Sequence, residues 1–191
     1  MPEQLDRMNV LYADQKYFQT AAEKILKRSE EKYGTGLTMS ANDGILSEKD
    51  VYAIDQYKKS GVSYPLNEAL RTDAPLTDTQ KKITHDLDQA LLKLPTYQGT
   101  VYRSLTSSMM GDFEGFKKRY IPGAAVIETA FTSSSADGVY DESMDVQMII
   151  QSKHGRDMRI YNPLEQEVLF RRGSIFMVDK VEGNTIWLTE I

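Results

Sequence analysis

Cysteine is absent from the 191 residues of this chain, and histidine occurs only twice. The missing thiols exclude disulfide bonds, thiolate metal sites and cysteine nucleophiles. The two histidines, His85 and His154, do not have the spacing of metal ligands. His85 falls on a predicted helix over 78–94 and is expected at the surface or in packing, and "KHGRD" around His154 predicts a loop. We expect no metal site.

A surplus of positive charge is also missing. The chain has 23 Lys and Arg residues against 28 Asp and Glu residues, and its formal net charge is -5. This balance, without a dense basic patch, disfavours a nucleic-acid partner. No apolar run approaches the ~20 residues that span a bilayer, and no signal peptide is recognised at the start. We therefore expect neither nucleic-acid binding nor a membrane span.

Three widespread motifs are missing as well. The sequence has no "GxxxxGK[ST]" phosphate loop, no "GxGxxG" after a strand and no "GxSxG" nucleophile elbow. A nucleotide, if one is used, must be held by another arrangement. A serine–histidine–acid triad without the elbow stays open at this point.

The first part of the chain, about residues 1–95, has helical periodicity. A stripe of apolar residues begins at Leu5 and stops at Gly34. "SEKDVYAIDQYKKSG" begins with a capping-type Ser47–Asp50 pair, and we expect Gly61 to end it. Two further helices complete this part: "YPLNEALR", with a proline in its first turn, and "TDTQKKITHDLDQALLKLP", with a Thr–Gln capping box.

The second part, about residues 96–191, changes to short β-type runs around one helical insert, "GDFEGFKKRY". "DMRIY" is one of these runs, and "VEGNT" predicts the turn of a final hairpin. No repeat, low-complexity tract or linker marks a boundary. We expect a single α+β domain over 1–191, with helices packed on the sheets.

Three polar features lie at apolar strands of the β-rich part. Arg103 lies in "GTVYRSL", the serine run "FTSSS" covers 131–135, and Glu165 and Glu167 precede "VLF". Taken singly, they are explained by a charge at a sheet edge, the start of a loop and a solvated strand end. Together they supply a guanidinium for phosphates, hydroxyls for orienting hydrogen bonds and carboxylates for a developing cation.

The two acids are predicted to open a strand. Side chains alternate between faces along a strand, so Glu165 and Glu167 would point the same way, roughly 7 Å apart. Like charges on one face repel, and the repulsion grows as water is excluded. This cost favours a function for the pair over a chance arrangement once the neighbouring motifs are considered.

The order of these motifs resembles the mono-ADP-ribosyltransferases of the R-S-E class, which include clostridial-type toxins and other bacterial effector toxins. Four longer segments are similar to that family: "YPLNEALR", "YQGTVYRSL", "PGAAVIETAFTSSS" and "EQEVLFRRGSIFMV". The resemblance extends over about residues 50–191. One departure is Ser133-Ser134-Ser135, where the family has Ser-Thr-Ser. The hydroxyl is retained, so the assignment is little affected.

The resemblance implies a fold of two facing antiparallel sheets that form an NAD cleft, with the N-terminal helices outside. It implies transfer of ADP-ribose from NAD to a protein side chain, with release of nicotinamide. Glu167 would stabilise the positive charge on the ribose, Ser133 would orient Glu167, and Glu165 would activate the acceptor. Because members with Glu-x-Glu modify arginine, arginine is the expected acceptor.

The resemblance also suggests residues that bind the two substrates. The residues expected to bind NAD are Arg103, Ser104, Ser133, Ser135, Asn67 and Arg71. "HGRDMRIYNPL" is similar to the family's substrate-recognition turns, so Tyr161 is expected to touch the target protein. A half-buried strand-end tyrosine is the competing interpretation, and Tyr140 is a further candidate for stacking on nicotinamide.

Two other functions stay open. The chain could be an NAD glycohydrolase toxin with water as acceptor, or a non-catalytic NAD-binding member of the fold. For the transferase, the expected setting is a secreted or injected bacterial effector and virulence factor that acts in the cytosol of a target cell. An immunity protein is kept as one further candidate partner.

Overall fold

A computed structural model describes residues 24, 27–28, 31–32, 46–109, 113–139 and 141–191 of the chain. Most of the stripe predicted between Leu5 and Gly34 lies outside these residues, and its five described positions are helical. Tyr140 also lies outside the described residues. No helix in the described ranges is both long enough and apolar enough to cross a membrane.

Between residue 46 and the first strand the structure describes three helices, and two of them begin at local sequence signals. They are α2 (Glu48–Tyr57), α3 (Ser60–Thr72) and α4 (Asp78–Lys93). The predicted capping boxes are confirmed: Ser47 and Asp50 bond reciprocally at α2, and Thr77 and Gln80 do so at α4. Each box satisfies backbone N–H groups that have no partner within the helix.

The predicted boundary at Gly61 is wrong. The chain breaks at Lys59, which has an extended backbone, and α3 begins at the next residue. Gly61 therefore lies inside α3, and Pro65 lies in its interior rather than in its first turn. Proline has no N–H, so Pro65 cannot make the helical bond to the carbonyl four residues earlier.

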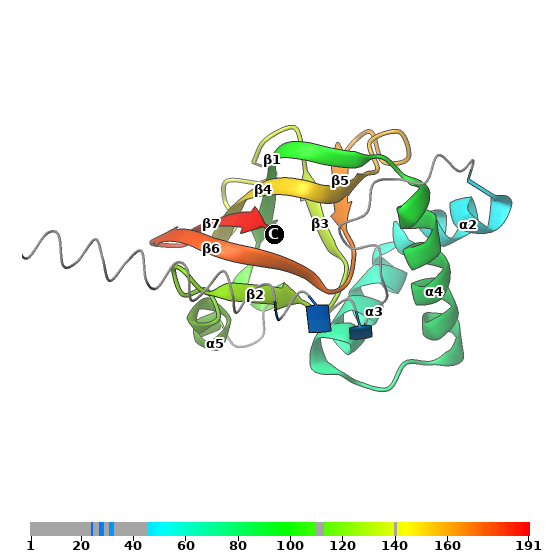
Figure 1. Cartoon of the computed structure of the whole chain (residues 1–191), viewed down its shortest axis with the longest axis horizontal. Coiled ribbons are helices and arrows are strands. Elements are labelled where there is room, and N and C mark those ends of the chain that lie inside the picture. The colour runs from blue at the N-terminus through cyan, green and yellow to red at the C-terminus, as the bar shows by residue number, and fades with distance from the viewer. Residues whose placement is uncertain (1–23, 25–26, 29–30, 33–45, 110–112, 140) are drawn as a thin grey trace, which may run out of the picture.

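Seven strands follow, interrupted by a 3-10 turn, η1 (Ser107–Met109), and a short helix, α5 (Phe113–Lys118). The strands are β1 (Thr96–Leu105), β2 (Ala125–Glu128), β3 (Thr132–Ser135), β4 (Val146–Asp157), β5 (Glu167–Phe170), β6 (Ser174–Glu182) and β7 (Thr185–Glu190). The final hairpin is confirmed, with its turn between β6 and β7. The α+β class is confirmed as well (Figure 1).

Two sequence predictions near His154 are wrong. "KHGRD" is not a loop but the end of β4, because β1 continues the ladder there and the Glu190 carboxylate accepts the N–H groups of Lys153 and His154 at 2.7 and 2.6 Å. "DMRIY" is not a strand, because β4 ends at Asp157 and the chain then turns until β5 begins.

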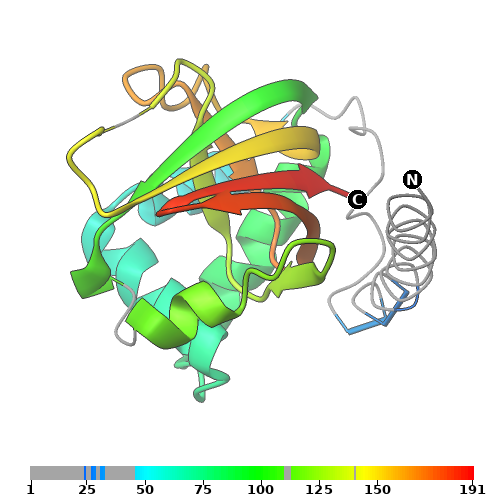
Figure 2. The ribbon, with the colours of Figure 1, turned by 90° about the vertical axis from the view of Figure 1, so that its left-hand side faces the viewer.

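The strands form two layers that share hydrogen bonds. The order is β1-β3-β5-β4-β7-β6-β2, with a further β1–β4 pairing, and every pair is antiparallel except β4–β7. Because the long strands β1 and β4 pair both with each other and with neighbours of either layer, one continuous network replaces two separate sheets. Figure 2 shows β1, β4, β7 and β6 side by side, with β3 and β5 behind them.

Alternation along β5 assigns its side chains to two apolar clusters. Val168 and Phe170 lie in the cluster between the strand layers, whereas Leu169 joins the cluster formed with α2, α3 and α4. The helices therefore cover the outer face of β3 and β5, as expected. Glu167 is two residues from Leu169 and shares its face, so the acid points to the side on which α2 and α3 lie.

Candidate active site

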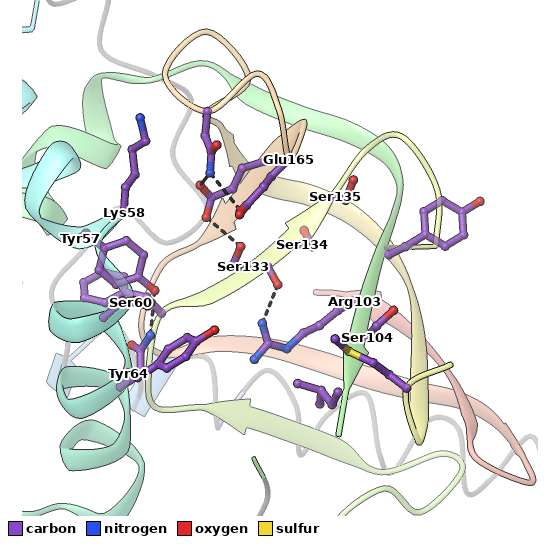
Figure 3. A pocket seen from close by; sticks show the side chains of 18 of the residues that line it. Tyr57, Lys58, Ser60, Tyr64, Arg103, Ser104, Ser133, Ser134, Ser135 and Glu165 are labelled. Atoms are coloured by element: carbon purple, nitrogen blue, oxygen red, sulfur yellow. Dashed lines mark hydrogen bonds between the residues drawn. The ribbon is translucent and has the colours of Figure 1, made fainter. Parts of the chain in front are cut away.

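A pocket of about 370 Å³ lies between α2, α3, β1, β3 and the turn before β5 (Figure 3). Eight residues expected at the site from the sequence line it: Asn67, Arg71, Arg103, Ser104, Ser133, Ser135, Glu165 and Glu167. Tyr161 is the exception and does not line the pocket. Neither histidine lines it, so the open possibility of a Ser–His–acid triad receives no geometric support here.

Glu167 is a buried carboxylate whose two oxygens have different donors. It is 4% exposed, and its Oε1 accepts a 2.7 Å hydrogen bond from Ser133 Oγ. Its Oε2 accepts a 2.9 Å bond from Asn162 Nδ2. Burial raises the pKa of Glu167 above its ordinary value, while the bonds from Asn162 and Ser133 oppose that rise. These bonds fix the plane of the carboxylate in the pocket.

Glu165 is exposed and lies in the turn before β5, not in the strand. The predicted alternation on one strand face is therefore wrong. Gln166 has a positive φ of 46°, which redirects the chain between the two acids, and β5 begins only at Glu167. The two carboxylates nevertheless converge, because Asn162 Nδ2 also donates to Glu165 Oε2 at 3.0 Å.

Arg103 comes from β1 and reaches the serine strand. Its Nη1 donates to the backbone oxygen of Ser133 at 2.7 Å. Burial lowers the pKa of this guanidinium, and the carboxylate of Glu128 opposes the shift. A partly buried cation with several N–H donors at a pocket wall is suited to an anionic ligand.

The serines of β3 take up different positions. Ser133 pairs with Leu169 and Ser135 with Glu167, so both serines lie on the face of the sheet that carries the Glu167 side chain. Ser134 donates instead to the backbone oxygen of Val168 at 2.8 Å.

Ser104 and Ser135 already hold neighbouring segments. Ser104 Oγ donates to Gln147 Oε1 at 2.6 Å and accepts from the N–H of Asp141 at 3.3 Å. Ser135 Oγ accepts from the N–H of Asp137 at 3.3 Å. These contacts give both serines a structural role at the pocket.

The helical wall of the pocket contributes Asn67 and Arg71 from α3. Asn67 is buried, and its Nδ2 donates to the Tyr57 hydroxyl at 2.8 Å. Its Oδ1 has no hydrogen-bond partner among the described residues. Arg71 lies one helical turn further on, where its Nη2 is 3.7 Å from the Glu68 carboxylate.

Tyr161 packs against the cluster formed by the helices and is half-buried, as in the competing interpretation, but it lies in a turn and not at a strand end. Its backbone oxygen accepts a 2.5 Å bond from Lys58 Nζ. The exposed apolar side chains of the same turn are Ile160 and Leu164, at 86% and 97% exposure.

Several residues that line the pocket were missed from the sequence, among them Tyr57, Lys58 and Asn162. Lys58 bonds Tyr161 and the ring of Tyr57 packs on Phe131, and no local pattern reveals contacts with residues so distant in the sequence. A signal existed for Asn162, because Asn-Pro is typical of a turn and places a polar amide three residues before the first acid.

A second hollow of about 500 Å³ adjoins the first and shares Arg71, Arg103 and Leu105 with it. Its wall includes Tyr120, whose hydroxyl donates to Glu128 Oε1 at 2.9 Å. Two hollows that meet at two arginines could accommodate a ligand with two lobes and an anionic centre. Among the described residues, no cluster of three or more His, Asp or Glu side chains could hold a metal ion.

Comparison with known proteins gives a consistent result. The sequence model of the ADP-ribosyltransferase exoenzyme family matches residues 14–187. A Mycobacterium avium protein named as a candidate NAD(+)–arginine ADP-ribosyltransferase, Mav, is 35% identical over 152 residues, which is 74% of this chain and 18% of that protein. The NAD(+)–protein-arginine ADP-ribosyltransferase Tre1 of Pseudomonas putida is 28% identical over 145 residues, 74% of this chain and 28% of Tre1. The chain thus spans less than one third of the length of either relative.

Solved structures share the fold. The type III effector XopAI of Xanthomonas axonopodis pv. citri superposes with a TM-score of 0.67 at 19% identity. The superposition covers 100% of this chain and 75% of XopAI. At this identity the likeness is one of fold.

Proposed function

The chain belongs to the ADP-ribosyltransferase exoenzyme family, and on that premise we propose that it transfers ADP-ribose from NAD to an arginine side chain of a protein. One observation carries the proposal. A buried carboxylate, Glu167, is bonded through both oxygens inside the pocket, and an exposed carboxylate, Glu165, is held beside it at the rim. The inner acid is suited to NAD, and the outer one to a second substrate that arrives from solvent.

The two adjoining hollows suit a dinucleotide. Arg71 and Arg103 stand where the hollows meet, so they would bind the pyrophosphate that joins the two nucleosides of NAD. Glu167 and Ser133 would then face the nicotinamide ribose in the first hollow. Oδ1 of buried Asn67, which has no partner among the described residues, offers NAD a further acceptor at the wall. Ser104 and Ser135 would contribute to NAD binding indirectly, by holding the segments that they bond at the pocket.

Glu167 would assist the cleavage of NAD. When the bond between ribose C1′ and the nicotinamide nitrogen breaks, its electron pair leaves with nicotinamide and positive charge develops on the ribose. A carboxylate fixed in a water-poor pocket stabilises that charge more than it stabilises the ground state. Ser133 keeps the carboxylate in place through its 2.7 Å bond.

Glu165 would act on the acceptor. An arginine guanidinium is cationic and a poor nucleophile until it loses a proton. Glu165 can orient it and take that proton while a guanidine nitrogen bonds to C1′, and the proton then passes to solvent. The products are nicotinamide and ADP-ribosylated arginine, so atoms and charge balance.

The rim of the pocket offers a contact for a protein substrate. Ile160 and Leu164 project from the turn that carries Glu165 and are almost fully exposed. They are better placed than the ring of Tyr161 to meet a target protein, since that ring packs on the helices. Delivery into a target cell and a toxin role belong to the same proposal, in line with the effector XopAI. An immunity protein stays a candidate partner from the sequence resemblance alone.

An acceptor assay tests the proposal. The protein is incubated with labelled NAD and one of two small acceptors, agmatine, which carries a guanidinium, or cadaverine, which carries only amines. We expect nicotinamide release with ADP-ribosyl-agmatine as product and no product from cadaverine. Nicotinamide release at the same rate with and without agmatine, and no adduct, would identify an NAD glycohydrolase. No release at all would leave an NAD-binding protein.

A further inference from the structure

One amide group joins the two acids of the site. Asn162 Nδ2 lies 2.9 Å from Oε2 of Glu167 and 3.0 Å from Oε2 of Glu165. A primary amide nitrogen carries two hydrogens, so it can donate one to each carboxylate. The opposite orientation of the amide would place its oxygen against two acceptors. The nitrogen is therefore the atom that satisfies both acids.

The backbone of Asn162 is fixed independently of these bonds. Its N–H donates to the backbone oxygen of Met158 at 2.8 Å, and Met158 is fully buried. The N–H of Met158 in turn donates to the backbone oxygen of Glu167 at 3.0 Å. The backbone of Asn162 is thus held by bonds through buried Met158 to Glu167, and its position does not depend on Glu165.

Glu165 depends on Asn162 in a way that Glu167 does not. In the part of the chain that the structure describes, the bond from Asn162 is the hydrogen bond that the Glu165 side chain makes. Glu165 is exposed and carries the same charge as its buried neighbour. Without the amide, repulsion would favour rotamers that turn this carboxylate towards water.

The amide also acts on the charge of Glu167. Burial raises the pKa of Glu167, and the Asn162 bond is the largest influence that lowers it, ahead of Ser133. Glu165 raises this pKa, and Lys58, the residue that follows α2, lowers it. The other titratable side chains that line the pocket come from three elements: Tyr57 of α2, Tyr64 and Arg71 of α3, and Tyr102 and Arg103 of β1. Arg103 bonds the backbone of Ser133.

We propose that Asn162 is a positioning residue of the reaction, which holds the carboxylates of Glu165 and Glu167 side by side. The inference rests on the proposed arginine transfer. Asn162 touches neither reacting atom and acts through the two acids: it keeps Glu167 ionised for the ribose and keeps Glu165 within reach of the guanidinium. Loss of the amide should reduce transfer to the acceptor more than cleavage of NAD, because only transfer needs both carboxylates in their positions.

Three variants test this role. Asn162→Ala removes the amide donor. Asn162→Asp keeps a side chain of nearly the same size but places a third negative charge beside the two acids. Gln166→Asn is the matched control, because Gln166 lies in the same turn and bonds Pro163 O, not the acids, and Asn tolerates its positive φ. Nicotinamide release without acceptor and ADP-ribosylation of agmatine are measured from about pH 5 to about pH 9.

We expect a characteristic change in Asn162→Ala. The acid limb of nicotinamide release moves to higher pH by on the order of one pH unit, since the ionised form of Glu167 loses a donor. At alkaline pH, where Glu167 is again deprotonated, the rate of agmatine modification stays about tenfold more reduced than the rate of nicotinamide release. The reason is that high pH restores the charge of Glu167 but does not restore the position of Glu165. Asn162→Asp loses both activities, and Gln166→Asn keeps the profile of the wild type.

Two results overturn the inference. One is an unchanged acid limb with both activities reduced in the same proportion, which would indicate a purely structural role. The other is an Asn162→Asp protein with normal transfer. If the wild type itself neither releases nicotinamide nor modifies agmatine, the proposed function fails. The role of Asn162 is then decided by ¹³C NMR titration of Glu167: a higher pKa in Asn162→Ala supports the role, and identical curves refute it.

Discussion

Lys58 Nζ donates a 2.5 Å hydrogen bond to the backbone oxygen of Tyr161, a residue 103 positions further along the chain. The contact joins the end of α2 to the turn that carries Glu165. It connects the two walls of the pocket, since Lys58 and Glu165 both line it. The helical part of the chain thus takes part in placing the acids of the β-rich part.

Lys58→Met should uncouple the turn from α2. The methionine keeps most of the aliphatic stem but cannot donate to Tyr161. We expect agmatine modification to fall about threefold to tenfold, with a smaller loss of nicotinamide release. Steady-state kinetics of both reactions check this, with Lys59→Met as the control because its side chain is exposed and does not line the pocket. Equal losses in the two variants would argue against the contact.

Glu165→Gln should separate transfer from cleavage. The amide keeps the shape of the side chain but cannot accept the acceptor's proton. We expect agmatine modification to fall at least about a hundredfold while nicotinamide release stays within about threefold of the wild type. Both products are quantified from the same reaction by mass spectrometry. If cleavage falls as far as transfer, Glu165 serves NAD chemistry or folding; if transfer survives, arginine is not activated by this acid.

Glu167→Gln should abolish both reactions and change how stability depends on pH. The folded-state pKa of Glu167 is raised, so this group favours the folded state fully below its ordinary pKa of 4.5, and that contribution is lost as pH rises through the folded-state value. The wild type should therefore lose unfolding free energy over that interval, and the variant should lose less. Urea denaturation across the acid range measures the difference. A variant with the same pH slope as the wild type would contradict the raised pKa.

Arg103→Lys should weaken NAD binding. An ammonium can balance charge but cannot bond the Ser133 backbone and two phosphate oxygens in a planar fork. We expect the Kd for NAD to rise about tenfold to a hundredfold. Calorimetry with NAD in a Glu167→Gln background measures binding without turnover. Arg159→Lys is the matched control, because Arg159 pairs with Asp157 and lines neither hollow. An unchanged Kd would return Arg103 to a structural role.

Gly155→Ala should destabilise the fold. A Cβ at this position would lie 2.6 Å from Ser152 Oγ and 2.7 Å from Val168 Cγ1, inside normal contact distance. We expect the free energy of unfolding to fall by about 1–3 kcal/mol. Gly61→Ala is the control, because nothing lies within 4 Å of its added Cβ, and it should be unchanged or more stable by at most about 1 kcal/mol. Thermal and urea denaturation of both variants decide the matter.

The sequence predicted what depends on neighbouring residues or on motif order. The caps at Ser47 and Thr77 are local, and both formed. From the order of the arginine, serine and glutamate motifs we expected Arg103, Ser133 and Glu167 at one site, and all three line one pocket although they come from three strands.

What the sequence did not predict depends on backbone conformation or on distant partners. The left-handed Gln166 has no signature of its own, so the place of Glu165 in a turn was missed. The break at Lys59 was misplaced because Gly61 offered a stronger stop signal than the residues before it. Lys58 meets a carbonyl from another part of the chain, and periodicity carries no information about such a contact.

The turn between Met158 and Glu167 has buried ends and an exposed tip. Its ends are joined by the backbone hydrogen bond between those two residues, whereas the side chains of Ile160 and Leu164 at the tip are exposed and do not pack in the core. Ile160 and Leu164 can therefore vary while Asn162 and Glu165 of the same turn stay unchanged. Under the proposed transfer, exchange of Ile160 and Leu164 would change which protein is modified without changing the reaction.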